Sequence, residues 1–176
     1  PVFTFFLTLT SYFLLFFRLI FVNFAMQEKD ITVNRKARHE YHIVQSYEAG
    51  IVLLGTEVKS LRQHKVNLTD SYAVIEGGEV WIVNSHINVY DHGNINNHDP
   101  LRKRKLLLNA SEIRKINSKV QSKGFTLIPL KLYFKNGKVK VELGLAEGKK
   151  LYDKRESIKE KDLKRDKDRN FKQFNK

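Results

Sequence analysis

The sequence lacks cysteine entirely, and it contains only three prolines and one tryptophan in 176 residues. Without cysteine there is no disulfide framework, no nucleophilic thiol and no thiolate-bound metal. The chain also lacks a Gly-x-Ser-x-Gly nucleophile elbow and a glycine-rich loop of the kind that cradles phosphates. We therefore expect no enzymatic activity and no cofactor, and the lack of cysteine is compatible with a reducing compartment such as the cytoplasm.

Histidine and acidic residues offer no convincing metal site or catalytic pair. His39 and His42 are three residues apart, a spacing that puts them on opposite faces of an expected strand. They are not the i, i+4 pair that brings two imidazoles to one metal ion from a helix. Glu57 and Asp70 are expected to form ion pairs on a basic surface. We therefore expect no metal site.

Acidic residues are too few to balance the basic ones. The chain has 32 Lys or Arg and 19 Asp or Glu, a net charge of +13, and a pI near 9.8. Such an excess concentrates a protein near polyanions and supplies contacts to phosphates, so nucleic acid is the first expected partner and an anionic membrane surface the second. The basic residues recur at the edges of expected elements, which indicates a surface that tracks phosphates. These runs are residues 35–39, Lys59 with Arg62 and Lys65, residues 102–105, and Lys149 with Lys150.

Residues 1–25 differ from the rest of the chain because they hold 8 of the 12 phenylalanines and a single charge, Arg18. Their apolar length could span a bilayer. However, Arg18 interrupts the run, no basic flank precedes it, and no small-x-small cleavage site follows. The only methionine, Met26, is followed at once by polar residues. We expect residues 1–25 to be a hydrophobic extension upstream of the true start at Met26, with a membrane segment or an unstructured extension as alternatives.

Residues 149–176 form a highly charged tail, with 12 Lys or Arg and 6 Asp or Glu, a net charge of +6. Its apolar residues are too sparse to build a core, so we expect it to fold only on a partner. Ser157 with Glu160 matches a capping box, and Glu160 with Lys164 an i, i+4 pair. These contribute at most about 1 kcal/mol, too little for an isolated helix.

Short strands dominate residues 26–148, the expected folded domain. Two hairpins have clear turn signals, because Gly77-Gly78 and Asn136-Gly137 supply the positive φ of tight turns. Residues 130–135 and 138–143 alternate so that one face is apolar and the other basic. A further β-type run covers residues 39–54, with a turn expected at Ala49-Gly50. Six or so short strands favour a small closed or nearly closed β-barrel.

Two short helices are expected between the strands. One covers residues 57–63, with Val58 and Leu61 on one face. The other follows Asn109, an expected N-cap with Glu112 three residues on, and runs to about Ser122 before Gly124 ends it. A polar loop is expected over residues 88–100. The domain should therefore be a mainly β barrel with short flanking helices.

Five ordered sequence blocks resemble the small protein B (SmpB) family, the tmRNA-binding or SsrA-binding proteins of bacterial trans-translation. The resemblance is collinear from about Thr32 to Asp166. The blocks are Asn-Arg-Lys-Ala-Arg-His-Glu-Tyr at 34–41, Glu-Val-Lys-Ser-Leu-Arg at 57–62, Asp-Ser-Tyr at 70–72, Asp-Pro-Leu-Arg-Lys-Arg-Lys-Leu-Leu-Leu-Asn at 99–109, and Gly-Lys-Lys-Leu-Tyr-Asp-Lys-Arg at 148–155.

The resemblance implies an oligonucleotide-binding (OB)-like barrel with flanking helices and a tail that is disordered until bound. It implies a protein that is not an enzyme, has no small-molecule substrate, and acts in the cytoplasm. Its partners would be the tRNA-like domain of alanylated tmRNA, elongation factor Tu, and a stalled ribosome. The protein would take that RNA into the vacant decoding site, where it supplies the volume of the anticodon arm that tmRNA lacks, and the tail would probe the empty mRNA channel as a helix.

The resemblance also implies two sets of site residues. Glu48 would accept hydrogen bonds from base edges rather than contact phosphates, which repel a carboxylate. Many family members have His where this chain has Tyr152, and either ring can stack on a nucleobase. The expected RNA-binding set is Asn34, Arg35, Lys36, Arg38, His39, Glu48, Lys59, Arg62, Leu107 and Asn109. The expected ribosome-binding set is Gly148, Lys149, Lys150, Tyr152, Asp153, Lys154 and Arg155.

Two alternative functions remain open at this point. A general translation protein could bind rRNA or tRNA through the same barrel without any role for tmRNA. A membrane-anchored interaction protein would depend wholly on residues 1–25. The blocks at 99–109 and 148–155 favour the tmRNA-binding function.

Overall fold

The computed structural model describes residues 28–93, 95 and 97–150, together with 152, 153, 159, 163 and 165–167 in the tail. The expected extension at residues 1–25, the predicted cap at Ser157, and the site residues Lys154 and Arg155 lie outside the described residues. Within the described part, no helix is long and apolar enough to cross a membrane.

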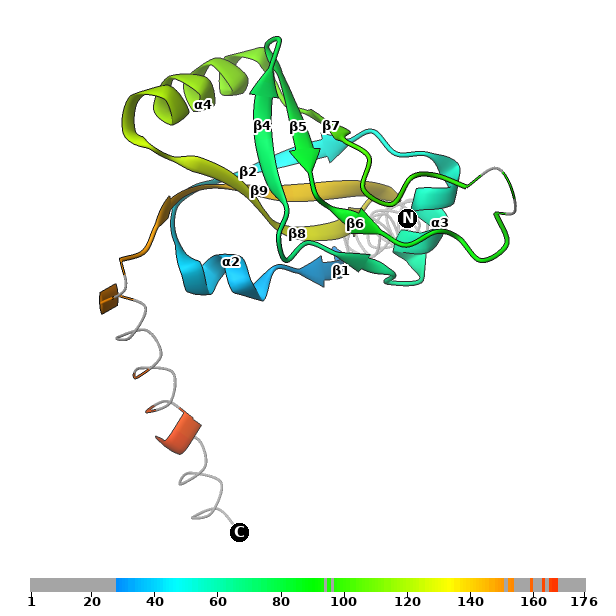
Figure 1. The fold of residues 1–176 in the computed structure, drawn as a ribbon, viewed down its shortest axis with the longest axis horizontal. Coiled ribbons are helices and arrows are strands. Elements are labelled where there is room, and N and C mark those ends of the chain that lie inside the picture. Colours follow the sequence, from blue (N-terminus) through cyan, green and yellow to red (C-terminus); the bar gives the residue numbers. More distant parts are fainter. Residues whose placement is uncertain are drawn as a thin grey trace, which may run out of the picture.

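Seven antiparallel strands form one sheet that closes on itself (Figure 1). Their order is β1-β8-β4-β5-β7-β2-β9, and pairing of β8 with β9 closes a ring of six strands, with β1 added along β8. The predicted mainly β fold is confirmed, and this closed sheet is compatible with the predicted OB-like barrel. A separate pair joins β3 (Val66–Asn67) to β6 (His86–Ile87). The seven strands are β1 (Lys29–Val33), β2 (Tyr41–Ile51), β4 (Tyr72–Glu76), β5 (Glu79–Val83), β7 (Arg104–Leu107), β8 (Thr126–Lys135) and β9 (Lys138–Gly148).

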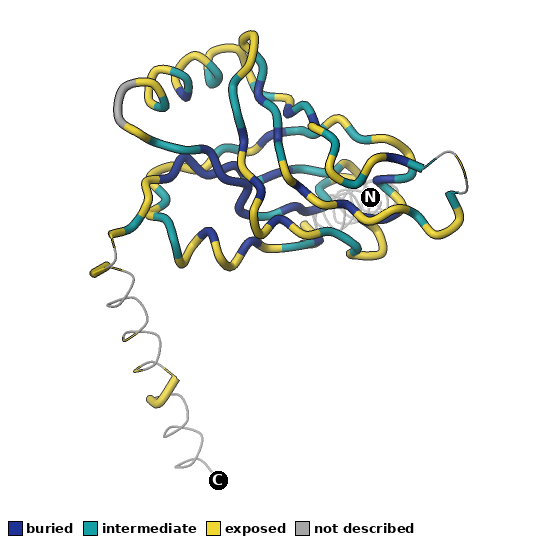
Figure 2. Tube along the Cα trace, viewed as in Figure 1, coloured by how far each residue is buried: buried dark blue, intermediate teal, exposed yellow. Residues whose placement is uncertain are grey.

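Alternate residues of these strands fill the barrel, as the period of two requires (Figure 2). Val80, Val141 and Leu143 are fully buried on the inner face. A second, smaller cluster lies under α2 (Arg35–Glu40), where Ala37 packs with Ile128. The central core cluster also includes Ala49, Leu61, Ile82, Leu106, Ile116, Leu127 and Leu145.

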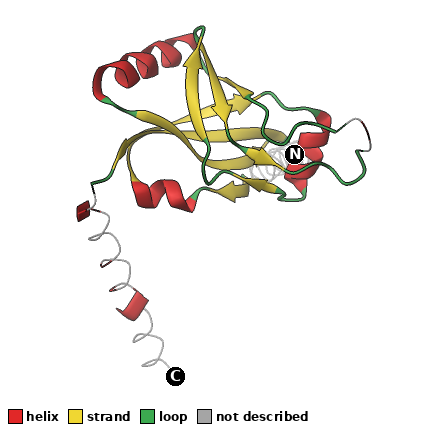
Figure 3. Ribbon diagram, in the orientation of Figure 1, coloured by secondary structure: helices red, strands yellow, loops and turns green. Residues whose placement is uncertain are grey.

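The two hairpins and the longest helix match their sequence signals (Figure 3). Gly77 has φ +60° and Asn136 has φ +52°, the left-handed conformations that tight turns need. α4 (Ala110–Lys123) begins after Asn109, whose backbone N–H donates to the Glu112 carboxylate at 3.0 Å. It ends at Gly124 with φ +63°. These predictions are confirmed.

The prediction of a β-type run over residues 39–54 is partly wrong. Residue 39 belongs to helix α2, and the strand β2 begins at Tyr41. Ala49 and Gly50 do not form a turn, since both lie inside β2. Gly50 pairs with Leu107, and a Cβ on it would lie 3.2 Å from the Leu107 Cβ. This glycine is explained by the close approach of β7, which a single sequence cannot distinguish from a chain reversal.

The basic run at residues 102–105 was expected on the surface, but one of its members, Arg104, is buried. The Arg104 side chain is fully buried, and its Nε donates to Glu57 Oε1 at 2.7 Å, while Arg102 Nε donates to the same oxygen at 2.8 Å. Burial opposes ionisation of Glu57, but hydrogen bonds from Arg102 and from the Leu54 backbone hold its pKa below the usual range. This ionic clamp joins the first turn of α3 (Gly55–Arg62) to β7.

Candidate RNA-binding surfaces

The predicted site residues occupy three places on the barrel, separated along β2. Strand β2 has 11 residues and spans roughly 30 Å. Figure 1 shows α2 and the start of the tail at one end of the barrel, with α3 at the other. We call these the α2 patch (α2 with residues 148–150), the wall (Glu48, Leu107 and Asn109, with the charged residues around Glu48) and the α3 patch (Lys59 and Arg62).

Asn34 is buried immediately before α2, and its side chain makes hydrogen bonds within the protein. Its Oδ1 accepts from the Ala37 N–H at 3.0 Å, and its Nδ2 donates to the carbonyls of Leu68 at 2.8 Å and Pro129 at 3.2 Å. Asn34 therefore positions α2 instead of presenting a side chain to RNA. The exposed residues of the helix are Arg35, Lys36, Arg38 and His39.

The start of the tail lies directly against α2. Gly148 is the last paired residue of β9, opposite Tyr41, and the Lys149 N–H donates to the Glu40 carbonyl at 2.9 Å. The Lys149 ammonium also donates to the Arg38 carbonyl at 3.3 Å. Residues assigned from the sequence to two different partners thus form one basic surface. No local pattern could have found a contact between positions 111 residues apart.

Tyr152 and Asp153 follow this junction, and both are exposed. The Asp153 carboxylate accepts from the Lys150 N–H at 3.2 Å, a local contact that orders the first turn of the tail. The Tyr152 side chain is 69% exposed, so its ring is available for stacking.

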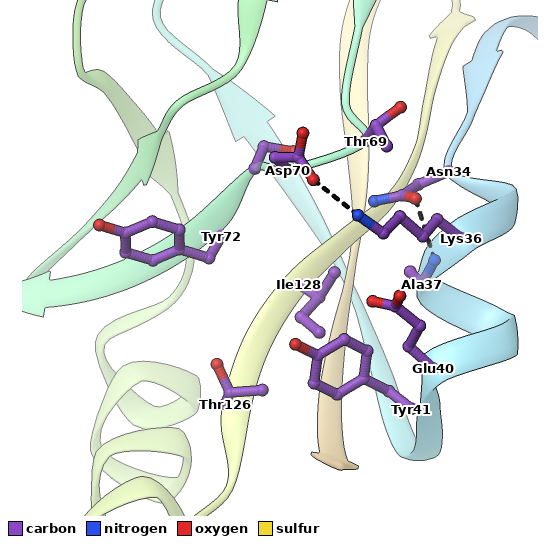
Figure 4. Close-up of a pocket in the computed structure, with 11 residues that line it drawn as sticks. Asn34, Lys36, Ala37, Glu40, Tyr41, Thr69, Asp70, Tyr72, Thr126 and Ile128 are labelled. Carbon is purple, nitrogen blue, oxygen red and sulfur yellow. Dashed lines mark hydrogen bonds and ion pairs between the residues drawn. The ribbon is translucent and has the colours of Figure 1, made fainter. Parts of the chain in front are cut away.

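A cleft of about 370 Å³ opens between α2, β4 and β8, and sequence reasoning missed it (Figure 4). It exists because β4 pairs with β8 at one position only, Ala73 with Leu127. The Lys36 and Asp70 side chains meet across it in an ion pair of 2.9 Å, as expected for Asp70. The rings of Tyr41 and Tyr72 also line it.

Glu48 on the wall makes hydrogen bonds and ion pairs within the protein that the sequence did not predict. Its Oε2 accepts from the Tyr133 hydroxyl and from Lys135, each at 2.7 Å, and Lys140 lies 3.6 Å from Oε1. The hydrogen bonds from Lys135 and Tyr133 lower the pKa of Glu48 to about 2. The carboxylate therefore holds two lysines as well as facing solvent, which no spacing in the sequence indicates.

The face of the β8–β9 hairpin that was expected to be basic carries mixed charge. Lys131, Lys135 and Lys140 each lie within 4 Å of a carboxylate, and Lys138 on the same face is exposed. Those carboxylates come from Glu28, Asp30, Glu48 and Glu142. The prediction of a basic face is wrong in this respect, because acids from β1, β2 and β9 converge on it.

Leu107 and Asn109 are exposed at the end of β7 and the start of α4. The Leu107 side chain is 54% exposed and lies over Gly50, two residues after Glu48 on the same face of β2. Asn109 is exposed at the start of α4. The structure therefore places Leu107 on the same outer face as Glu48, and Asn109 follows two residues later at the start of α4.

Lys59 and Arg62 are exposed on α3. The Lys59 ammonium lies 5.1 Å from the centre of the Tyr90 ring, a cation–π contact. Among the described residues, no group of three or more His, Cys, Asp or Glu could hold a metal ion.

Several known proteins similar to this chain belong to one family. A sequence model of the SmpB protein family matches residues 31–173. The SsrA-binding protein of Acetivibrio thermocellus is 59% identical over 150 residues, 85% of this chain and 97% of that protein. The SsrA-binding protein of Geobacter metallireducens is 59% identical over 141 residues, 80% of this chain and 92% of that protein.

A solved structure agrees with these relatives. It is described as "tmRNA-SmpB: a journey to the center of the bacterial ribosome", and one of its chains is 55% identical with a TM-score of 0.59. The match covers 68% of this chain and 85% of that one. With the family match spanning the barrel and most of the tail, the chain belongs to the SmpB family of RNA-binding proteins.

Proposed function

We propose that this protein binds tmRNA and delivers its alanylated form to stalled ribosomes, where trans-translation tags the nascent chain. The observation that carries the proposal is the family match over residues 31–173, since the relatives are named for binding SsrA RNA. The surfaces described above support it, because exposed cations at both ends of the barrel flank an exposed apolar residue on the wall.

The barrel binds the tRNA-like domain of tmRNA. Leu107 and Asn109 contact unpaired bases, with Glu48 beside them, while Lys59 and Arg62 bind phosphates. Arg35, Lys36, Arg38 and His39 add backbone contacts from α2, which Asn34 holds in place. The protein acts by binding and positioning, without catalysis, and elongation factor Tu accompanies the alanylated RNA. With these partners, the protein would act in the bacterial cytoplasm.

The tail acts on the ribosome. Gly148, Lys149 and Lys150 leave the barrel beside α2, and the exposed Tyr152 stacks on a base near the decoding site. Asp153, Lys154 and Arg155 complete the contact, and the rest of the tail enters the empty mRNA channel as a helix.

Competition between two RNAs tests the proposal. The full chain should bind the isolated tRNA-like domain of tmRNA much more tightly than an elongator tRNA at the same salt concentration, and tmRNA should co-purify from cells. Equal affinity for the two RNAs would instead indicate a general rRNA- or tRNA-binding translation protein.

A further inference from the structure

The loop after β6 packs against α3 and carries two aromatic rings that the proposed function does not use. The Asn88 N–H donates to the Lys65 carbonyl at 3.1 Å, and the Lys65 ammonium pairs with the Asp91 carboxylate. The Tyr90 ring lies under the Lys59 ammonium. Contacts of three kinds therefore fix this loop, one to α3 through Lys59 and two to Lys65 in the turn that follows α3.

Hydrogen bonds within the loop also hold the backbone of Tyr90. Asn97 Oδ1 accepts from the Tyr90 N–H at 3.0 Å, and its Nδ2 donates to the Tyr90 carbonyl at 2.9 Å. The Gly93 N–H donates to the same carbonyl at 2.8 Å. A Cβ at Gly93 would lie 2.5 Å from Asn97 Oδ1, so a side chain there would displace the Asn97 amide. The backbone of Tyr90 is thus held on both sides before any partner binds.

The Tyr90 and His92 rings differ in their exposure to solvent. Tyr90 is half-buried, and His92 is exposed with its ring centre 5.4 Å from that of Tyr90 at an interplanar angle of 72°. Lys59 is exposed on the neighbouring helix. An exposed ring beside an exposed cation is the pair of groups that binds a single-stranded nucleotide, because the ring stacks on the base and the cation binds the phosphate. The Asp91 charge, which would repel that phosphate, is countered by Lys65.

We propose that Lys59, Tyr90 and His92 form a nucleotide-binding site for RNA, in which the His92 ring stacks on an unpaired base, the Lys59 ammonium binds the adjoining phosphate, and Tyr90 positions both. The site rests on the proposed function in one respect, since it assigns the nucleotide to the tRNA-like domain of tmRNA. It extends the α3 patch from phosphate contacts to base contacts.

Substitutions of His92 test the stacking. His92→Ala should raise the Kd for the tRNA-like domain about 5- to 100-fold without changing the slope of log K against log salt, since no phosphate contact is lost. His92→Phe should bind within about twofold of the parent, because a ring remains. The matched control is His86→Ala, which removes an exposed histidine from β6 and should have no effect. If His92→Phe were as defective as His92→Ala, or if His92→Ala bound normally, the stacking role would be wrong.

The positioning role of Tyr90 needs its own comparison. Tyr90→Leu should weaken RNA binding with an unchanged thermal midpoint, and Tyr90→Phe should restore it, since the ring that contacts Lys59 and His92 is retained. Equal binding by the Leu and Phe variants would remove Tyr90 from the site.

A fluorescence titration distinguishes failure of this site from failure of the proposed function. Trp81→Phe removes the one natural tryptophan, and His92→Trp in that background places an indole at the site. Its emission should be quenched in step with binding of the tRNA-like domain. Normal binding without quenching would overturn the site alone, and quenching by ribosomes but not by this RNA would overturn its assignment. A parent that does not prefer the tRNA-like domain over an elongator tRNA would overturn the proposed function itself.

Discussion

The wall around Glu48 and the α2 patch both carry basic residues, but their electrostatic settings are opposite. On the wall, Lys131, Lys135 and Lys140 all lie within 4 Å of carboxylates. Among the described residues of the α2 patch, Lys36 is the only basic side chain in an ion pair, and its partner Asp70 is exposed.

This difference shows that a net charge of +13 does not by itself locate a phosphate-binding surface. Cations that are already neutralised release few counterions when a phosphate arrives, whereas unpaired cations contribute fully. The wall is therefore suited to base contacts around Leu107, and the α2 patch is suited to the RNA backbone.

The largest effect concerns the segment that joins the α2 patch to the tail. Truncation after Gly148 removes residues that pack on α2 but none from the wall. Because Lys149 and Lys150 are proposed to contact the ribosome, and Arg35 and Arg38 on α2 remain, we expect tmRNA binding to change by less than about twofold and tagging of nascent chains on stalled ribosomes to be lost. Filter binding and a reconstituted tagging assay measure the two quantities. A truncated protein that still supported tagging would refute this division of labour.

Buried charge should matter far more to stability than charge on either surface. Arg104→Met removes one of the two guanidinium groups that pair with the buried Glu57 carboxylate, while Arg102 remains, and should lower the free energy of unfolding by about 1.5–3 kcal/mol. Its neighbour Lys103 pairs with Glu76 in solvent, so Lys103→Met is the control and should cost less than about 1 kcal/mol. Urea denaturation measures both. Similar losses for the two variants would show that the clamp is not what joins α3 to β7.

Salt dependence compares the two surfaces directly. Arg35→Ala with Arg38→Ala should reduce the slope of log K against log salt by about 2 for tmRNA binding, and Lys59→Ala by about 1. Lys135→Ala with Lys140→Ala should reduce it by less than about 1, because Glu48 already neutralises these lysines.

Glu48→Ala should weaken binding without reducing that slope, since no cation is removed. Equal reductions for the α2 and wall double variants would show that the wall also binds phosphates. A reduced slope for Glu48→Ala would show that its contact with base edges is wrongly assigned.

The smallest effect is the pH dependence contributed by the wall. The pKa of Glu48 is lowered from 4.5 to about 2 by hydrogen bonds from Lys135 and Tyr133. A lowered pKa stabilises the folded state above the unfolded value, and this contribution is lost as the pH falls from about 4.5 through 2. The side chain is 40% exposed, so solvent screening keeps the effect modest. The stability difference between the parent and Glu48→Gln should shrink across that window, and a constant difference would contradict the assignment.

Local sequence signals were sufficient for the hairpins and for α4, because Asn136-Gly137 and the Asn109–Gly124 pattern act through neighbouring residues. They failed where the cause lies far away in the chain. Gly50 is a glycine because of β7, and Arg104 is buried because Glu57, 47 residues earlier, reaches it. The lysines around Glu48 are a further example, since they come from β8 and β9 and not from its own strand.

The central claim is that barrel and tail have separate tasks, the barrel binding tmRNA and the tail acting as a shaped helix on the ribosome. Leu163, which is helical and 62% exposed, allows a direct test. Leu163→Pro keeps the tail charge of +6 but costs about 3 kcal/mol of helix stability. Measuring tmRNA affinity and tagging rate on the same preparation should give an unchanged affinity with a severe loss of tagging. Tagging at the parental rate would contradict the helix and leave electrostatic tethering as the role of the tail.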